Sequence, residues 1–131
     1  MKFRNVVVTL LMALGLAISI TPGAMAVSDS WTHPGDIGRA SYNDNGDSYW
    51  VCDIKTDDIG VVGRINVKQA DGSWHHFPYV RDGNGNNGDC STPNNVDVIR
   101  ENAYYTFTVC LQNTSGGTPY YCRESPQIPG A

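Results

Sequence analysis

The chain has 131 residues, four cysteines and a formal net charge of −4, with thirteen acidic side chains against nine basic ones. The basic residues form no cluster, so the composition argues against binding to nucleic acid or to an anionic membrane surface. The length fits one domain of ordinary size.

Residues 1–26 have the layout of a secretory signal peptide. Lys2 and Arg4 give a positive start, residues 6–20 form an uncharged apolar run, and residues 24–26 read Ala-Met-Ala. An apolar run of about 15 residues is shorter than the roughly 20 that a membrane-spanning helix needs. We therefore expect a secreted protein without a membrane anchor. Cleavage would remove two basic residues and leave a mature chain, residues 27–131, with a formal charge of −6.

The mature chain shows almost no helix signal. Short alternating runs rich in Val, Ile, Tyr and Thr are separated by Gly, Asn, Asp and Pro, which predicts an all-β domain of antiparallel strands. We expect residues 27–46 to be a lead-in with one edge strand near Arg39–Tyr42, residues 47–125 to be the domain, and residues 126–131 to be a tail. Strands are expected at residues 49–54, 61–69, 74–80, 96–99, 104–111 and 119–123.

The four cysteines predict two disulfides, because the count is even in an exported chain and no CxxC pair suggests a metal site. Alternation along residues 104–111 puts Tyr, Phe, Val and Leu on the core face, so Cys110 should point away from the core. Cys110 and Cys122 are symmetric about Gly116, which would set them opposite each other in a hairpin. We predict a Cys110–Cys122 bond and, by elimination, a Cys52–Cys90 bond, among three possible connectivities.

The segment VRDGNGNNGDC, residues 80–90, resembles the start of a calcium loop. Asp82, Asn84 and Asp89 supply oxygens, but Asn87 occupies the place of the loop glycine and Pro93 the place of the closing Glu. The alternative is a turn-rich surface loop held by its cysteine and mobile over residues 83–88. We favour this second interpretation and predict no metal site.

Residues 74–79 contain four aromatic or imidazole rings in a row. Alternation puts Trp74 and His76 on one face and His75, Phe77 and Tyr79 on the other, so the two histidines cannot easily share a metal. The functional interpretation is an aromatic platform for a sugar or a protein. The alternative, which we favour, is core packing on one face and ordinary surface on the other.

Residues 49–123 resemble a fibronectin type III domain. The motifs are RINVKQADGSW, then IRENAYYTFTVCLQN, then the turn SGGTP. The resemblance implies an antiparallel immunoglobulin/fibronectin-III-like sandwich of about seven strands, but no specific function. The layout also resembles that of small secreted bacterial proteins. In this topology residues 55–60, 81–95 and 112–118 form loops at one end.

Common enzyme motifs are missing: there is no GxSxG, HExxH or P-loop. His33 has no visible partner, and we expect no cofactor. The leading hypothesis is a binding or interaction module for an extracellular protein or a carbohydrate. The alternative is an inhibitor of an extracellular hydrolase, and a small extracellular enzyme is the least favoured. The candidate binding residues are Asp57, Asp58, Asp82, Asn84, Asp89 and Trp74.

Overall fold

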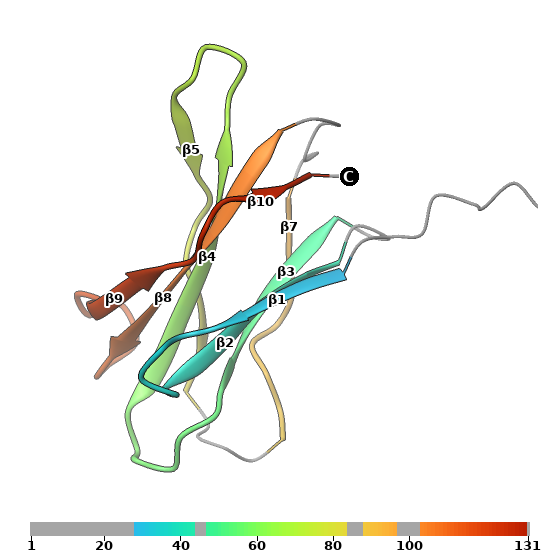
Figure 1. The fold of residues 1–131 in the computed structure, drawn as a ribbon. Coiled ribbons are helices and arrows are strands. Elements are labelled where there is room, and N and C mark those ends of the chain that lie inside the picture. The colour runs from blue at the N-terminus through green and yellow to red at the C-terminus, as the bar shows by residue number, and fades with distance from the viewer. Residues whose placement is uncertain (1–27, 44–46, 84–87, 97–102, 131) are drawn as a thin grey trace, which may run out of the picture.

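The computed structural model describes residues 28–43, 47–83, 88–96 and 103–130. This part of the chain contains ten strands and no helix, and the strands form two antiparallel sheets (Figure 1). The all-β antiparallel prediction is therefore confirmed. The predicted signal peptide, Asn84 and residues 97–102 lie outside the described residues.

The two sheets divide the chain unequally. The first has the strand order β1-β2-β3-β7, and the second has the order β10-β8-β4-β5, with β6 also paired to β4 and β9 also paired to β8. The chain passes from the first sheet to the second after β3, returns to the first for β7, and ends in the second. The strands are β1 (Ser28–Thr32), β2 (Gly38–Asn43), β3 (Ser48–Asp53), β4 (Gly60–Lys68), β5 (Trp74–His76), β6 (Val80–Asp82), β7 (Asn94–Asn95), β8 (Tyr104–Gln112), β9 (Tyr120–Glu124) and β10 (Ile128–Pro129).

The core lies between the two sheets and is centred on the long β4–β8 pair, whose register runs from Gly60↔Gln112 to Val67↔Tyr105. Both strands are rich in β-branched and aromatic residues, which suit a pleated and buried surface. Their odd-numbered side chains face the first sheet, as the alternation in residues 104–111 predicts. The buried cluster contains Ile37, Ala40, Tyr42, Tyr49, Val51, Val61, Ile65, Val67, Val96, Tyr105, Phe107 and Val109.

Two glycines allow the sheets to approach closely. A methyl group at Gly38 would lie 2.4 Å from a methyl carbon of Val61, and one at Gly63 would lie 3.0 Å from the Cβ of Val51. Any larger residue at Gly38 would therefore push the sheets apart or force Val61 out of its rotamer. Gly63 interrupts the apolar side chains of β4 because Val51 of the opposite sheet fills that space.

Residues 28–43 differ from the prediction of a lead-in with a single edge strand. They form two paired strands, with Trp31 opposite Ala40, and Tyr42 packs in the core. The strand β1, with the sequence SDSWT, was missed because it lacks the alternation of apolar and polar residues. It lies at the edge of its sheet and contributes a single apolar side chain, Trp31. The predicted tail also contains a short strand, β10, which pairs with the start of β8.

The predicted strand at residues 74–80 is broken into β5 and β6. Pro78 lies between them, and proline has no N–H to donate to a sheet ladder. Its carbonyl accepts a 2.5 Å hydrogen bond from the hydroxyl of Tyr49, whose pKa is raised by burial and lowered in part by the hydrogen bond from Asn94. Of the strand predicted at residues 96–99, only Val96 lies in the described part; it directly follows the short strand β7 at Asn94–Asn95.

The two predicted disulfides are confirmed: Cys52 is bonded to Cys90, and Cys110 to Cys122. Cys110 lies on the side of β8 away from the core, as expected, but it is fully buried there. The hydroxyl of Tyr79 lies 3.7 Å from its sulfur. Tyr79 was expected on the face of His75 and Phe77, and this was wrong because the break at Pro78 reverses the alternation.

Strand β9 contains a bulge next to the second disulfide. The β8–β9 register shifts by one residue between Val109 and Leu111, and Tyr121 is the extra residue. Tyr121 has φ of 53°, a left-handed backbone that a bulky side chain rarely adopts. The pairs Thr108–Glu124 and Val109–Arg123 are therefore symmetric about Gly116, whereas the pair Leu111–Tyr120, beyond the bulge, is not.

Candidate functional site

Three loops begin or end at one end of the sandwich, which we call the loop end (residues 54–59, 88–93 and 113–119). Gly60 at the start of β4 pairs with Gln112 at the end of β8, and Val61 pairs with Asp82 at the end of β6. The Asp82 carboxylate accepts a 2.7 Å hydrogen bond from the backbone N–H of Asp53, where β3 ends. The described bases of these loops therefore lie together, as the predicted topology requires, but residues 81–82 and 94–95, which were expected in a loop, belong to β6 and β7.

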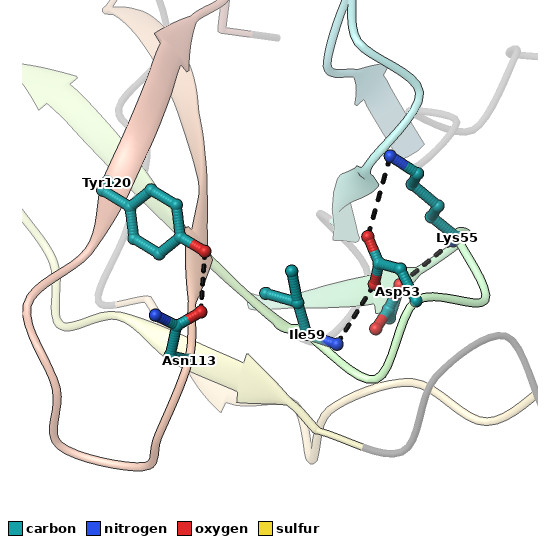
Figure 2. Close-up of polar contacts among 6 residues, drawn as sticks. Asp53, Lys55, Ile59, Asn113 and Tyr120 are labelled. Atoms are coloured by element: carbon teal, nitrogen blue, oxygen red, sulfur yellow. Dashed lines mark hydrogen bonds and ion pairs between the residues drawn. The ribbon is translucent and has the colours of Figure 1, made fainter.

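The loop between β3 and β4 is built by its own carboxylates (Figure 2). Asp53 accepts the N–H of Lys55 at 3.0 Å, and Asp57 accepts the N–H of Ile59 at 3.1 Å, so each forms a local turn. Asp58 has φ of 58°, a conformation that Asp tolerates better than most residues. Lys55 and Asp57 also form an ion pair at 3.7 Å. Asp57 thus has a structural role, while the Asp58 side chain is exposed.

Asp53 and Asp82 lie inside the sandwich rather than on its surface, at 3% and 1% exposure. Burial raises the pKa of Asp53; the Lys55 N–H lowers it, the charges of Asp57 and Asp82 raise it, and Arg81 lowers it. One oxygen of Asp53, Oδ2, is buried without a hydrogen-bond partner. Asp82, a candidate binding residue, is therefore placed as an internal support for the end of β3.

The loop between β6 and β7 is fixed near its cysteine. The Cys52–Cys90 bond joins it to β3, and Ser91 exchanges hydrogen bonds with Val51, through its N–H at 2.8 Å and its hydroxyl at 3.0 Å. Asp89 is exposed beside the disulfide. Asn84 lies outside the described residues, so the structure does not place this candidate.

The β8–β9 hairpin tip is held by polar contacts as well as by its disulfide. The Gln112 side chain donates to the carbonyl of Gly117 at 2.7 Å, and Gly117 donates to the carbonyl of Thr114 at 2.9 Å. Gly116 has φ of 79°, which favours glycine. The Tyr120 hydroxyl donates to Asn113 at 2.7 Å (Figure 2). This tip is exposed, and its shape is set from within.

Trp74 lies away from the other candidates, at the opposite end of β4. It pairs with Lys68, eight positions along β4 from Gly60, which is roughly 25 Å at the rise of an extended strand. The Lys68 ammonium lies 5.9 Å from the centre of the Trp74 ring. The loop end and Trp74 are therefore separate surfaces.

A row of hydrogen-bonded polar side chains crosses the second sheet and was not predicted. Asn66 donates from Nδ2 to the hydroxyls of Thr106 at 3.0 Å and Thr108 at 2.8 Å, and its Oδ1 lies 2.7 Å from Nδ1 of His76. The Thr106 hydroxyl donates to Glu124 at 2.5 Å. In the sequence these residues alternate with apolar ones, which is also the pattern of an ordinary solvent face, so no signal marked them.

His33 also has partners that the sequence did not reveal. It is buried, its Nδ1 accepts the N–H of Gly35 at 2.8 Å, and its Nε2 lies 3.0 Å from the carbonyl oxygen of Tyr121. The Gly35 N–H must donate, so the imidazole hydrogen is on Nε2 and donates to Tyr121. His33 thus connects the β1–β2 turn with β9, 88 positions away in the chain.

Among the described residues, no group of three or more His, Cys, Asp or Glu side chains is arranged to hold a metal ion. The same part of the chain has no helix of the length and apolarity needed to cross a membrane. No protein-family model matches the chain, and neither the curated proteins nor the solved structures contain a match.

Proposed function

We propose that the chain is a secreted binding module with an immunoglobulin/fibronectin-III-like fold. The strand order supports this fold: β2, β3 and β7 are neighbours in one sheet and β4, β8 and β9 in the other. Strands A, B and E and strands C, F and G have the same two neighbourhoods in an immunoglobulin sandwich. The sequence of residues 1–26 and the two disulfides support secretion, because disulfides persist in oxidising compartments.

The main support for a binding function is that contacts within the protein hold the loops of the loop end in place. The Cys52–Cys90 bond, the Asp82 carboxylate and the Gln112 side chain each hold the base of a different loop. Side chains at the loop tips, including Asp58 and Asp89, remain exposed. Loops that are already ordered lose less conformational entropy when a partner binds, so such an arrangement favours recognition of an extracellular protein or carbohydrate.

The test is capture of a partner by loop variants. Immobilised mature protein is exposed to culture supernatant of the source cells, and the captured material is compared for the parent, Asp58→Asn/Asp89→Asn, and the control Asp71→Asn. Asp71 is exposed on the turn at the opposite end of the sandwich, and Asn keeps its acceptor oxygen for Ser73. We expect the control to retain the partner and the double variant to lose most of it.

Equal capture by the parent and the Asp58→Asn/Asp89→Asn variant would contradict a binding surface at these carboxylates. Loss with Asp71→Asn alone would point to the other end of the molecule.

The rigid β8–β9 tip favours a second candidate, an inhibitor of an extracellular hydrolase. The Cys110–Cys122 bond and the Gln112 side chain close this tip. Inhibitors of proteases likewise bind an active site with a segment whose backbone changes little on binding. A panel of extracellular proteases and glycosidases provides the test. Ser115→Asp at this tip should abolish inhibition, whereas Ala70→Asp at the β4–β5 turn should leave it unchanged. Lack of inhibition across the panel favours the binding module.

A further inference from the structure

The side of the second sheet that faces away from the core carries a positive strip. On β4 the core residues are Val61, Ile65 and Val67, so Arg64 and Lys68 project to the other side. We call this side the outer face; it includes Asn66 of β4, Trp74 and His76 of β5, Arg81 of β6, and Thr106 and Thr108 of β8. Its Trp74 and Lys68 end lies far from the loop end of the proposed function, whereas Arg81 lies next to the loop end.

Three cations lie along the outer face. Arg64 and Lys68 are four positions apart on β4, roughly 13 Å in an extended strand. Arg81 pairs opposite Val62 and lies over Gly60, where a methyl group would lie 2.4 Å from Arg81 Nη2. Half of the six basic side chains in the described ranges are therefore in one strip, although the whole chain has a net charge of −4.

These cations form no close ion pair within the described part of the protein, although the charge of Arg81 acts on Asp53 and the carboxylate of Glu124 lies on the same face, hydrogen-bonded to Thr106. Between described residues the ion pair found is Lys55–Asp57, at the loop end, and none of the three outer-face cations pairs with a carboxylate. The Nε atoms of Arg64 and Arg81 are also buried without a hydrogen-bond partner. Half-buried charge without a counterion is costly in free energy, so the strip favours an anionic ligand.

Aromatic rings lie beside two of the cations. The Arg64 guanidinium lies 4.7 Å from the centre of the Tyr79 ring, and the Lys68 ammonium lies 5.9 Å from that of Trp74. Such contacts hold a cation in place without removing its charge. Tyr104, one position before the residue that pairs with Val67, is 46% exposed and adds a further ring on the same side.

The row of hydrogen-bonded polar side chains described above, which we call the polar row (Asn66, His76, Thr106, Thr108 and Glu124), supplies an oriented hydrogen-bond acceptor. Asn66 uses both Nδ2 hydrogens on Thr106 and Thr108, so its Oδ1 must face His76. Nδ1 of the imidazole therefore carries a hydrogen, and in the neutral ring Nε2 of this exposed histidine has a free lone pair. The outer face thus combines positive charge, aromatic rings and an acceptor for a hydroxyl group.

We propose that the outer face binds an anionic polysaccharide whose sugar rings carry carboxylates. Lys68 and Arg64 pair with carboxylates, the Trp74 ring packs on a sugar face, and His76 Nε2 accepts a sugar hydroxyl. A polymer with at most one carboxylate per ring matches a single file of cations. Nucleic acid, with its denser charge, is repelled by the acidic remainder of the protein.

Binding of polygalacturonate tests the proposal, with neutral dextran as the comparison and calorimetric titration as the measurement. Arg64→Gln/Lys68→Gln should weaken polygalacturonate binding about tenfold or more, the loss expected for charge-assisted hydrogen bonds. Arg39→Gln/Lys55→Gln is the matched control, because it removes the same charge from other surfaces, and its affinity should stay within about twofold of the parent. Trp74→Ala should also weaken binding.

Salt dependence of the parent chain provides a measurement that needs no variant: affinity should fall steadily as sodium chloride is raised. The proposal is overturned if polygalacturonate does not bind at millimolar concentration, if dextran binds equally well, or if both double variants lose affinity alike. Tighter binding to duplex DNA or to anionic phospholipid vesicles than to polygalacturonate would also overturn it and identify the other class of ligand.

Discussion

The two sides of the β4–β8 pair are both buried, but for different physical reasons. On the inner side, Ile65, Phe107 and Val109 are fully buried in an apolar core. On the outer side, Asn66 and Thr106 are almost as buried, at 1% and 3% exposure, and are held by hydrogen bonds. Alternation along a strand therefore separates apolar from polar residues here, but it does not separate buried residues from exposed ones.

The difference predicts two kinds of response to mutation. Apolar burial is non-directional and roughly proportional to area, so the inner side should respond to lost volume. A buried hydrogen-bond row contributes little net free energy while complete, but it is costly when one partner is removed. The outer side should therefore respond to lost pairing rather than to lost size.

The largest effect is expected on the inner side. Phe107→Ala should lower the free energy of unfolding by about 3–5 kcal/mol, because it leaves a cavity between the two sheets. Urea denaturation measures this change, and Phe107→Leu should cost clearly less. A loss below about 1 kcal/mol for Phe107→Ala would mean that the inner side is not close-packed.

The disulfide on the outer side should have the next largest effect. Cys110→Ser/Cys122→Ser should lower the free energy of unfolding by about 3 kcal/mol, from the chain entropy of a loop of 12 residues. The corresponding change at Cys52 and Cys90, which are 38 residues apart, should cost about 4 kcal/mol by the same model. Thermal and urea unfolding of the two double variants test the order. The reverse order would show that burial of Cys110 contributes more than loop length.

The polar row gives a smaller and more specific effect. Asn66→Ala should cost about 2 kcal/mol, because two buried threonine hydroxyls lose their donor. The triple variant Asn66→Leu/Thr106→Val/Thr108→Val should recover most of this loss, since the two groups that lose a partner, His76 and Glu124, are exposed and can hydrogen-bond to water. The midpoints of urea denaturation of both variants measure this difference in stability. If the triple variant is less stable than Asn66→Ala, the row contributes to stability in its own right.

The smallest effect concerns Asp53, a carboxyl group at the loop end of the inner side. Burial raises its pKa in the folded protein, so the folded state binds its proton more tightly than the unfolded state. Its contribution to stability is present below the ordinary Asp pKa of about 4 and is lost as the pH rises through the higher folded pKa. We expect Asp53→Asn to lack this loss, so the stability difference between variant and parent should grow with pH in that window. A difference that does not change with pH would contradict the prediction.

The elements that the sequence predicted well are those with local signals. The β8 alternation and the symmetry of Cys110 and Cys122 about Gly116 fix a hairpin from a few neighbouring residues. The convergence of three loops followed from chain direction alone. The hairpin depends on a short sequence separation, and the convergence of the loops depends only on the order of the strands, so a sequence pattern can represent both.

The features that were missed depend on distant partners. Strand β1 is recognisable only through its pairing with β2, and His33 finds its acceptor 88 positions away in Tyr121. The polar row was hidden because Asn and Thr in a strand look the same whether they face water or one another. Of the candidate residues, Asp82 was predicted at the correct end of the molecule. Its burial was missed because it is accompanied by a hydrogen bond from the backbone N–H of Asp53, a partner 29 positions away that the sequence does not reveal.

The bulge at Tyr121 has a consequence for how separate molecules meet. Strand β9 is an exposed edge of its sheet, and a regular exposed edge can recruit a strand from another molecule and start aggregation. The left-handed backbone of Tyr121 interrupts the spacing of that edge, and its carbonyl is already occupied by His33. An incoming strand therefore meets no continuous ladder beside the two exposed tyrosines of this edge.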